Sequence, residues 1–187
     1  VLGLFLASGV SGPVVAGEQS ASSAVVLTWY RLVLELVRHT ATYSPPVASR
    51  SFAYIGITAF ETLAGGDPRL HSLAGQLNDF TAPPPRETVA TYDEALALNA
   101  AMTVSVAYFF GNTGPSGQQA MQRMADLQRE RLVAGVDPDV VARSEAQGRA
   151  VAEHVIAWSL TDGGIPVENM GFPRDHQVST APGHWVP

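Results

Sequence analysis

The chain has 187 residues, of which 46% are hydrophobic and 15% charged, so it is long and apolar enough for one globular domain with its own core. Its net charge of −6 and pI near 5.2 argue against a nucleic-acid or anionic-membrane surface, because either would need a basic patch. All eleven basic residues are Arg. Because the chain holds no Lys and no Cys, it cannot form disulfides, thiolate metal sites, cysteine nucleophiles or phosphate loops of the G-x-x-x-x-G-K type.

The N-terminal segment is typical of the apolar part of a secretory signal peptide. An apolar run over residues 1–10 is followed by Gly12-Pro13, which breaks a helix, and by a small-residue cleavage pattern at residues 14–16. The run is too short to span a membrane, and a buried N-terminal helix is the alternative. We expect residues 1–16 to be removed on export to the periplasm or the medium. With no initiator Met at the start and no polar tail at the end, we expect a fragment of a longer protein.

Two helices are predicted before a long irregular connection. The first covers about residues 22–42, with Val26, Tyr30, Val33 and Val37 on one face at helical spacing. The second covers residues 46–63, begins after a Ser-Pro-Pro stop and ends at a Gly pair. Residues 67–91 then form the connection, with at most one helical turn at residues 70–77 before three consecutive prolines. A segment of this kind is expected to lie along the outside of the domain.

Three further helices complete the predicted bundle. The third, residues 93–110, is the most apolar and is expected to be buried on most sides rather than to span a membrane. The fourth, residues 116–134, is polar and opens with a capping box, S-x-x-Q. The fifth starts at Asp137-Pro138 and ends at residues 162–164. Its expected inner face comprises Val141, Ser144, Gly148, Val151, Val155 and Trp158. A Gly on that face predicts a close crossing by another helix.

The sequence therefore predicts an all-α fold, a bundle of about five helices over residues 22–164 with an irregular tail at 165–187. No strand-like alternation and no internal repeat is present in the sequence. Because the third helix is apolar all round and the fourth can cover little, we expect an exposed apolar patch over the second, third and fifth helices. Such a patch marks an interface, and the isolated chain would then aggregate or bind a hydrophobic dye.

Residues with catalytic or metal-binding chemistry are few. Glu35 and His39 share a helix face, and an exposed pair at a helix end explains them better than a metal site does. Asp175, His176 and His184 lie in the tail without a scaffold, which makes a metal-binding bundle the weakest of the functional hypotheses. The paired Glu-x-x-His motifs of di-iron bundles and the G-x-S-x-G of hydrolases are absent.

Arg50 and Glu61 on the second helix receive a structural interpretation. Eleven residues apart, they point the same way but lie about 16 Å from each other, too far to pair. Each is expected to pair with a group on a neighbouring helix, because a charge in apolar surroundings needs a partner.

Several segments occur in an order that resembles a known family. They are Trp29, the stretch 40–50 (T-A-T-Y-S-P-P-V-A-S-R), 59–61 (A-F-E), 92–93 (Y-D), 99–101 (N-A-A), 144–148 (S-E-A-Q-G), Ala152, 156–158 (I-A-W), 162–163 (D-G) and 182–187 (P-G-H-W-V-P). This order resembles the N-terminal helices of the vanadium-dependent haloperoxidases, whose superfamily includes the type 2 phosphatidic acid phosphatases. The resemblance covers about residues 25–187.

The resemblance also implies what this chain lacks. In that family, vanadate or phosphate is held by a Lys, two Arg, a Ser, a backbone Gly and a His, while a second His acts as acid–base or phosphoryl-accepting group. These come from K-x6-R-P, P-S-G-H and S-R-x5-H motifs, which follow the P-G-x-W-x-P segment. Pro182-Gly183-His184 lacks the Ser, and the Arg149–His154 spacing is one residue too short. We transfer no catalytic, cofactor-binding or metal-ligating residue to this chain.

The resulting hypothesis is an exported scaffold portion of a haloperoxidase-like or phosphatase-like enzyme. The resemblance implies vanadate as cofactor of the whole enzyme and a missing C-terminal catalytic half as partner of this chain. On this hypothesis the chain alone is not an enzyme and binds no cofactor. The choice between haloperoxidase and phosphatase, the substrate and the oligomeric state stay open. The rival hypothesis is a stand-alone exported helical binding or interaction domain without catalysis.

Overall fold

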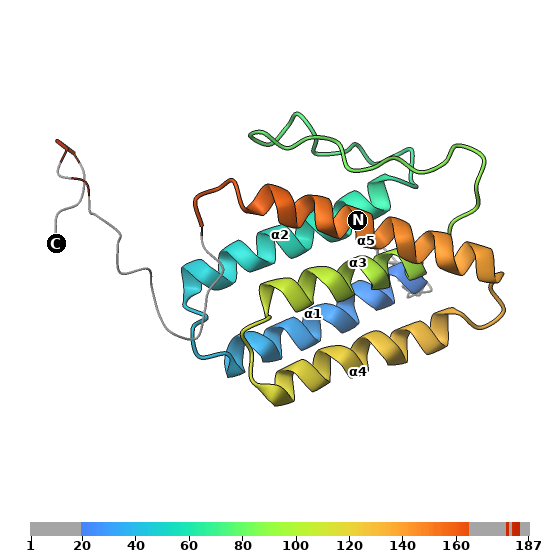
Figure 1. Ribbon diagram of the computed structural model, residues 1–187, viewed down its shortest axis with the longest axis horizontal. Coiled ribbons are helices and arrows are strands. Elements are labelled where there is room, and N and C mark those ends of the chain that lie inside the picture. Colours follow the sequence, from blue (N-terminus) through green and yellow to red (C-terminus); the bar gives the residue numbers. More distant parts are fainter. Residues whose placement is uncertain (1–19, 165–178, 180, 184–187) are drawn as a thin grey trace, which may run out of the picture.

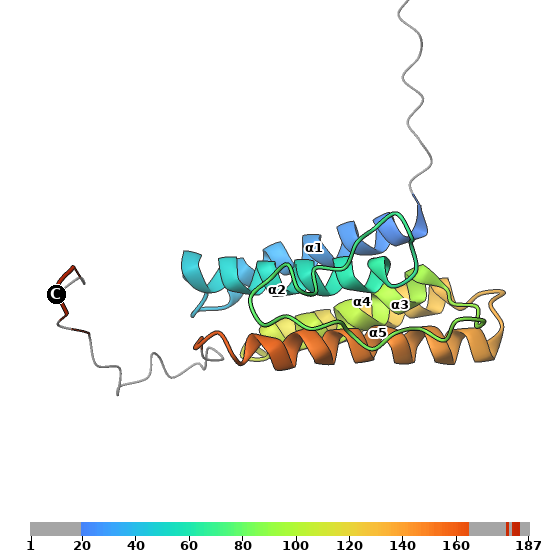
Figure 2. The ribbon, with the colours of Figure 1, turned by 90° about the horizontal axis from the view of Figure 1, so that it is seen from above.

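The computed structural model describes residues 20–164, 179 and 181–183. Within these it contains five α-helices and no strand: α1 (Ala21–His39), α2 (Pro45–Ala64), α3 (Glu94–Phe109), α4 (Pro115–Leu132) and α5 (Pro138–Ser159). The central helix α3 packs against all four others, while α2 also packs on α5 and α1 on α4 (Figures 1 and 2). The predicted all-α bundle is confirmed. The expected signal peptide at residues 1–16 and most of the 165–187 tail lie outside the described residues.

The helix starts follow from local capping chemistry. Ser20, Asp93 and Asp137 precede α1, α3 and α5, and each side chain accepts a hydrogen bond from a backbone N–H of the first turn. The capping box predicted for α4 is wrong, because the helix begins one residue earlier, at Pro115, with no side-chain cap. Proline at the first helical position already has a helical φ and has no N–H to satisfy.

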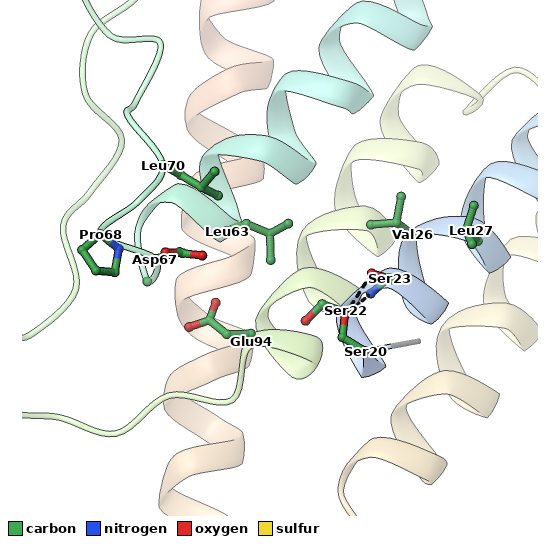
Figure 3. A pocket seen from close by; sticks show the side chains of 11 residues that line it. Ser20, Ser22, Ser23, Val26, Leu27, Leu63, Asp67, Pro68, Leu70 and Glu94 are labelled. Carbon is green, nitrogen blue, oxygen red and sulfur yellow. Dashed lines mark hydrogen bonds between the residues drawn. The ribbon is translucent and has the colours of Figure 1, made fainter. Parts of the chain in front are cut away.

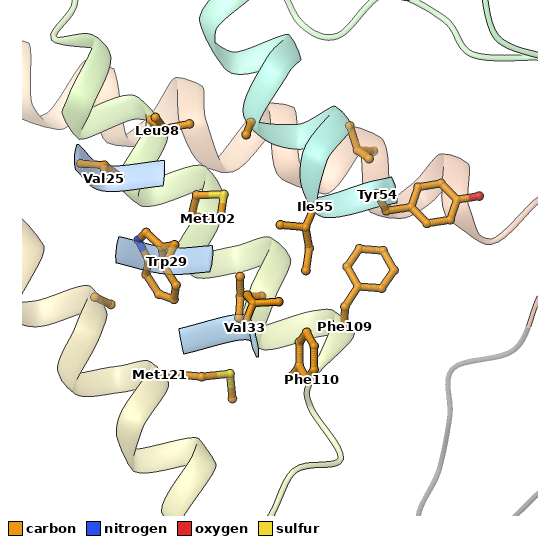
Figure 4. Packing of buried hydrophobic residues seen from close by; sticks show 14 of the residues in the cluster. Val25, Trp29, Val33, Tyr54, Ile55, Leu98, Met102, Phe109, Phe110 and Met121 are labelled. Carbon is orange, nitrogen blue, oxygen red and sulfur yellow. The ribbon is translucent and has the colours of Figure 1, made fainter. Parts of the chain in front are cut away.

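The inward face of α1 differs from the predicted one. The buried residues are Val25, Trp29, Val33 and Leu36, whereas Val26, Tyr30 and Val37 of the predicted face are only half-buried. Apolar residues cover so wide an arc of α1 that spacing alone cannot select the inner face. Trp29 contributes to the orientation of α1, because it is fully buried among the core residues of Figure 4 and its Nε1 donates to Asn99 Oδ1 at 2.9 Å.

Burial of α3 on most sides is confirmed, but the predicted exposed patch is wrong in position. Eleven of the sixteen α3 residues are buried. The exposed large hydrophobic residues of the described chain are Leu27 and Leu34 on α1, Tyr108 on α3, Leu127 on α4, and Val89 and Leu160 outside the helices. None lies on α2 or within α5. The polar helix α4 nonetheless contributes Met121 and Ala125 to the core, and this narrow stripe completes the enclosure of α3.

The predicted close crossing at Gly148 is confirmed. A Cβ at this position of α5 would overlap the carbonyl oxygen of Ala97 and would lie 3.0 Å from the backbone nitrogen of Ala101, both on α3. Glycine therefore allows the backbones of α5 and α3 to approach each other closely. The predicted inner face of α5 is buried as expected except at Trp158, which is half-buried.

Residues 67–91 follow an irregular path along the outside of α2 and α5 (Figures 1 and 2). We call this segment the strap. It contains no helix, and in place of the helical turn allowed at residues 70–77 it has a single i to i+4 bond, from Leu77 N to Leu73 O at 3.2 Å. Phe80 anchors it in the core at 2% exposure, with its ring 4.7 Å from that of Trp158. The predicted outside position is confirmed.

Candidate functional site

One charged cluster joins the start of α2 to the end of α5. The Arg50 guanidinium donates to both carboxylate oxygens of Asp162, at 2.8 and 3.1 Å, and to the Ser159 carbonyl at 2.7 Å. Asp162 also accepts from the Tyr54 hydroxyl and from Gly164 N, each at 2.7 Å. We call this the exit cluster, because it also binds Gly164 N, just beyond the end of α5. The prediction that Arg50 pairs with a neighbouring helix is confirmed by the Ser159 carbonyl at the end of α5.

The electrostatics of the exit cluster hold it in one charge state at neutral pH. The hydrogen bond from Arg50 lowers the pKa of Asp162 to about 2. Burial, and then the hydrogen bond to Asp162, raise the pKa of Tyr54 to about 12, so the phenol stays protonated and donates. The Arg50 guanidinium also lies 5.0 Å from the Tyr54 ring centroid. Since Arg50 Nε and Nη2, the Tyr54 hydroxyl and both Asp162 oxygens bond within the cluster or to the end of α5, the exit cluster acts as a structural tie.

Glu61, the other charged residue singled out on this helix, pairs differently from the prediction. Its carboxylate accepts from Ser72 Oγ at 2.8 Å and from Leu73 N at 2.6 Å, and both partners belong to the strap rather than to a helix. The strap brings these donors over α2 and thereby satisfies a carboxylate that is only 3% exposed. The periodicity of the sequence cannot place an irregular segment, so it could not identify this partner.

A second charged cluster, absent from the sequence interpretation, lies at the other end of α2. Both terminal nitrogens of Arg86 donate to the Glu94 carboxylate, Nη2 to Oε2 at 2.7 Å, and Nη2 also donates to the Thr62 carbonyl at 3.0 Å. We call this the strap cluster. A Cβ on Gly66 would overlap both charged groups, so the Gly pair after α2 makes room for them. In the sequence, the Gly pair was the one signal of a close approach by other side chains, but the sequence analysis interpreted it only as a helix stop.

Side chains from one face of α5 fasten the strap. Arg143, Gln147, His154 and Trp158 direct ring or side-chain nitrogens at the carbonyl oxygens of Thr91, Pro84, Thr81 and Asn78, at 2.9, 2.7, 2.9 and 3.0 Å respectively. The spacings along α5 of four, seven and four residues place the four side chains on the same face. They satisfy carbonyl groups that have no partner in regular secondary structure.

Residues from separate segments of the resemblance meet in pairs across the bundle. Trp29 contacts Asn99 as described above, and Ser144 Oγ accepts from Asp93 N at 2.8 Å, which joins α5 to the start of α3. Arg50 meets Asp162 in the exit cluster. These residues therefore position helices against one another.

Two depressions in the surface flank the strap cluster. The larger, about 980 Å³, lies between α1 and the end of α2 and is lined by Asp67, Glu94, three serines and several apolar residues (Figure 3). The smaller, about 530 Å³, lies under the strap, and Arg86 is the cation in its wall. A phosphate-like oxyanion needs several converging cations and N–H donors. The first depression is acidic and the second offers an Arg already bound to Glu94, so neither is suited to such a ligand.

The other sequence candidates are surface features. Glu35 and His39 form an exposed pair at the end of α1, with Nε2 to Oε2 at 3.7 Å, as expected. Within the described residues, no group of three or more His, Asp or Glu side chains could hold a metal ion. Arg149 pairs with Glu145 at 3.9 Å and His154 with the strap, so they do not converge. Asp175, His176 and His184 lie outside the described residues.

None of the described helices is long and apolar enough to cross a membrane.

Comparison with known proteins shows a similarity to an enzyme of known structure. A bacterial vanadium-dependent iodoperoxidase of known crystal structure is similar to this chain, with 28% sequence identity and a TM-score of 0.61. The match covers 73% of this chain and 31% of the iodoperoxidase chain, so this chain corresponds to about a third of that protein. No family model matches the sequence, and no curated protein does. The bundle thus has the fold of a segment of a haloperoxidase.

Proposed function

We propose that this chain is the N-terminal scaffold portion of an exported vanadium-dependent haloperoxidase-like or acid-phosphatase-like enzyme. The observation that carries the proposal is the likeness to the bacterial iodoperoxidase, which combines 28% identity with a match to only 31% of that protein. The order of segments in the sequence, from Trp29 to the P-G-H-W-V-P of residues 182–187, agrees with this likeness.

The scaffold role agrees with how the described cations are used. Arg50 and Arg86, the two most enclosed in ion pairs, are each bound by a carboxylate and a backbone carbonyl. An oxyanion site needs cations that are preorganised and free to meet the ligand. The groups that bind vanadate or phosphate would therefore come from the portion of the enzyme that follows this chain. The same oxyanion pocket would serve either peroxide-dependent halide oxidation or phosphomonoester hydrolysis.

The test begins with the complete product of the reading frame that encodes this chain. We expect it to contain K-x6-R-P, P-S-G-H and S-R-x5-H motifs after residue 187, and to oxidise iodide or bromide with peroxide once loaded with vanadate. Hydrolysis of a phosphomonoester without halide oxidation would assign the phosphatase branch. A complete product with none of the motifs and neither activity would refute the proposal.

A titration of the 187-residue chain distinguishes scaffold from binding site. We expect calorimetry with orthovanadate to show binding no tighter than about millimolar, because Arg50 and Arg86, the most enclosed of the ion-paired cations, are already bound to carboxylates. Saturable micromolar binding would contradict the scaffold role. Export is tested separately by N-terminal sequencing of the secreted product, whose first residue is expected near residue 17.

The rival function, a stand-alone binding or interaction domain, is favoured by one observation. The described bundle encloses its central helix, and its buried apolar residues form one contiguous cluster. A bundle of this kind has the core that an independent domain requires. The sequence of the complete product distinguishes the two functions, because a reading frame without oxyanion-binding motifs would leave the interaction domain as the better hypothesis.

A further inference from the structure

The turn that follows α5 contains the one Asp–Gly bond of the sequence, between Asp162 and Gly163. At an Asp–Gly bond the main-chain nitrogen of the glycine can attack the side-chain carboxyl carbon of the aspartate, because glycine has no side chain to hinder the approach. The other aspartates are followed by Pro, which has no N–H, or by residues with a side chain. The sequence therefore favours this reaction at Asp162.

The reaction is an isomerisation that needs only water. The Gly163 nitrogen forms a bond to Cγ of Asp162, and one carboxyl oxygen leaves as water with the amide proton and the carboxyl proton, which gives a cyclic imide (a succinimide). Water then adds to the former main-chain carbonyl carbon of Asp162 and breaks its bond to the nitrogen. The product, isoaspartate, continues the main chain through Cγ and has an unchanged mass. Because the leaving oxygen must be protonated, an ionised carboxylate held by hydrogen bonds reacts slowly.

Both reacting groups lie outside the helix. Asp162 follows the α5 C-cap, Leu160, and its side chain is 30% exposed, so water can reach it. Gly163 has a φ of +74°, a left-handed conformation that glycine adopts without strain. The Gly163 N–H donates to none of the described residues, whereas the next amide, Gly164 N, donates to Asp162 Oδ1 at 2.7 Å. The attacking nitrogen is therefore not held by the bundle.

The exit cluster restrains the carboxyl group that would be attacked. Asp162 Oδ2 accepts from Arg50 Nε at 2.8 Å and from the Tyr54 hydroxyl at 2.7 Å, while Oδ1 accepts from Arg50 Nη2 at 3.1 Å and from Gly164 N. These hydrogen bonds, above all those from Arg50, lower the pKa of Asp162 to about 2, so the carboxyl group stays ionised at neutral pH. Attack by Gly163 N requires this group to take up a proton and to give up part of these bonds.

We infer that Asp162 is the site of isoaspartate formation in this protein, and that Arg50 and Tyr54 of α2 keep the reaction slow. The inference does not depend on the proposed function. Isomerisation adds one methylene to the main chain and removes the carboxylate from the end of its side chain. Arg50 and Tyr54 would then lose their acceptor, and the path of the chain after α5 would change. A transient opening of the exit cluster would thereby become permanent.

Incubation of the 187-residue chain at neutral pH tests the inference. Isoaspartate at residue 162 is measured over time by peptide mapping with electron-transfer mass spectrometry, which distinguishes the two isomers by their fragments. A synthetic peptide of residues 158–168 gives the rate in the absence of the fold. Arg50→Ala removes two of the donors to the carboxylate. Glu94→Ala is the matched control, because it breaks the strap cluster at the other end of α2 and leaves the exit cluster intact.

The rates are compared at a temperature at which circular dichroism shows both variants to be folded. We expect the wild-type chain and Glu94→Ala to isomerise about tenfold more slowly than the peptide, and Arg50→Ala at a rate near that of the peptide, because the reaction requires local opening of the exit cluster. Equal rates for wild type and peptide, or no acceleration by Arg50→Ala, would overturn the inference. Equal acceleration by both substitutions would overturn it in favour of protection by overall stability, and isoaspartate that forms first at another aspartate would refute the assignment of the site.

Discussion

The two ends of α2 carry charged clusters built in different ways. In the exit cluster, the side chains of Arg50 and Asp162 are 24% and 30% exposed, and Tyr54 and Gly164 complete the coordination of the carboxylate. In the strap cluster, Arg86 is only 10% exposed, and its Nε is buried without a hydrogen-bond partner. Loss of a partner is costly where the remaining charge is enclosed and mild where water can replace it. The strap cluster should therefore be the more sensitive of the two.

The largest effect is expected from Glu94→Ala. The substitution leaves the Arg86 guanidinium enclosed with the Thr62 carbonyl as its remaining acceptor, and should lower the free energy of unfolding by about 3 kcal/mol. Urea unfolding followed by circular dichroism measures the change. Glu87→Ala removes an exposed carboxylate from the same region and should change stability little. Equal effects of the two substitutions would show that Arg86 does not depend on Glu94.

A smaller loss is expected from Arg50→Ala at the other end of α2. Asp162 keeps two donors and is partly hydrated, so the free energy of unfolding should fall by about 1.5 kcal/mol, in the range of hydrogen bonds to charged groups. The Arg69–Asp67 pair supplies the control: the Arg69 side chain is 86% exposed, so Arg69→Ala should leave the melting temperature unchanged. A loss from Arg50→Ala that matched Glu94→Ala would remove the distinction between the clusters.

The sequence predicted that Arg50 has a partner, but it did not predict the strap cluster, and the difference has a physical cause. Arg50 lies in apolar helical sequence, so its need for a partner was evident, whereas Arg86 and Glu94 lie in or next to an irregular segment whose path periodicity cannot describe. The same limit explains the wrong partner for Glu61. Gly148 was predictable because a glycine on a buried helix face has few explanations other than close packing. The orientation of α1 was not, because its apolar arc extends beyond the face that the core buries.

Acid should weaken the exit cluster by a modest amount. The folded pKa of Asp162, about 2, is below its ordinary value of 3.8, so its contribution to stability is fully present above pH 3.8 and is lost as the pH falls through 2. Partial exposure screens the interaction, and we expect the contribution to be under about 1 kcal/mol. The difference in melting temperature between wild type and Asp162→Asn should therefore shrink from pH 7 to pH 2.5. A difference that stays constant over this range would contradict the assigned ionisation.

The crossing at Gly148 also restricts which alignments of α5 along α3 can form. A shift of α5 by one residue would place Gln147 or Arg149 against the Ala97 carbonyl, where even a Cβ does not fit. These shifted registers are therefore excluded because atoms would overlap, and not because the helices would attract each other less strongly. The apolar face of α3 could otherwise accept α5 at several heights, because most of its buried side chains are small or flexible. One missing methyl group thus selects a single native register.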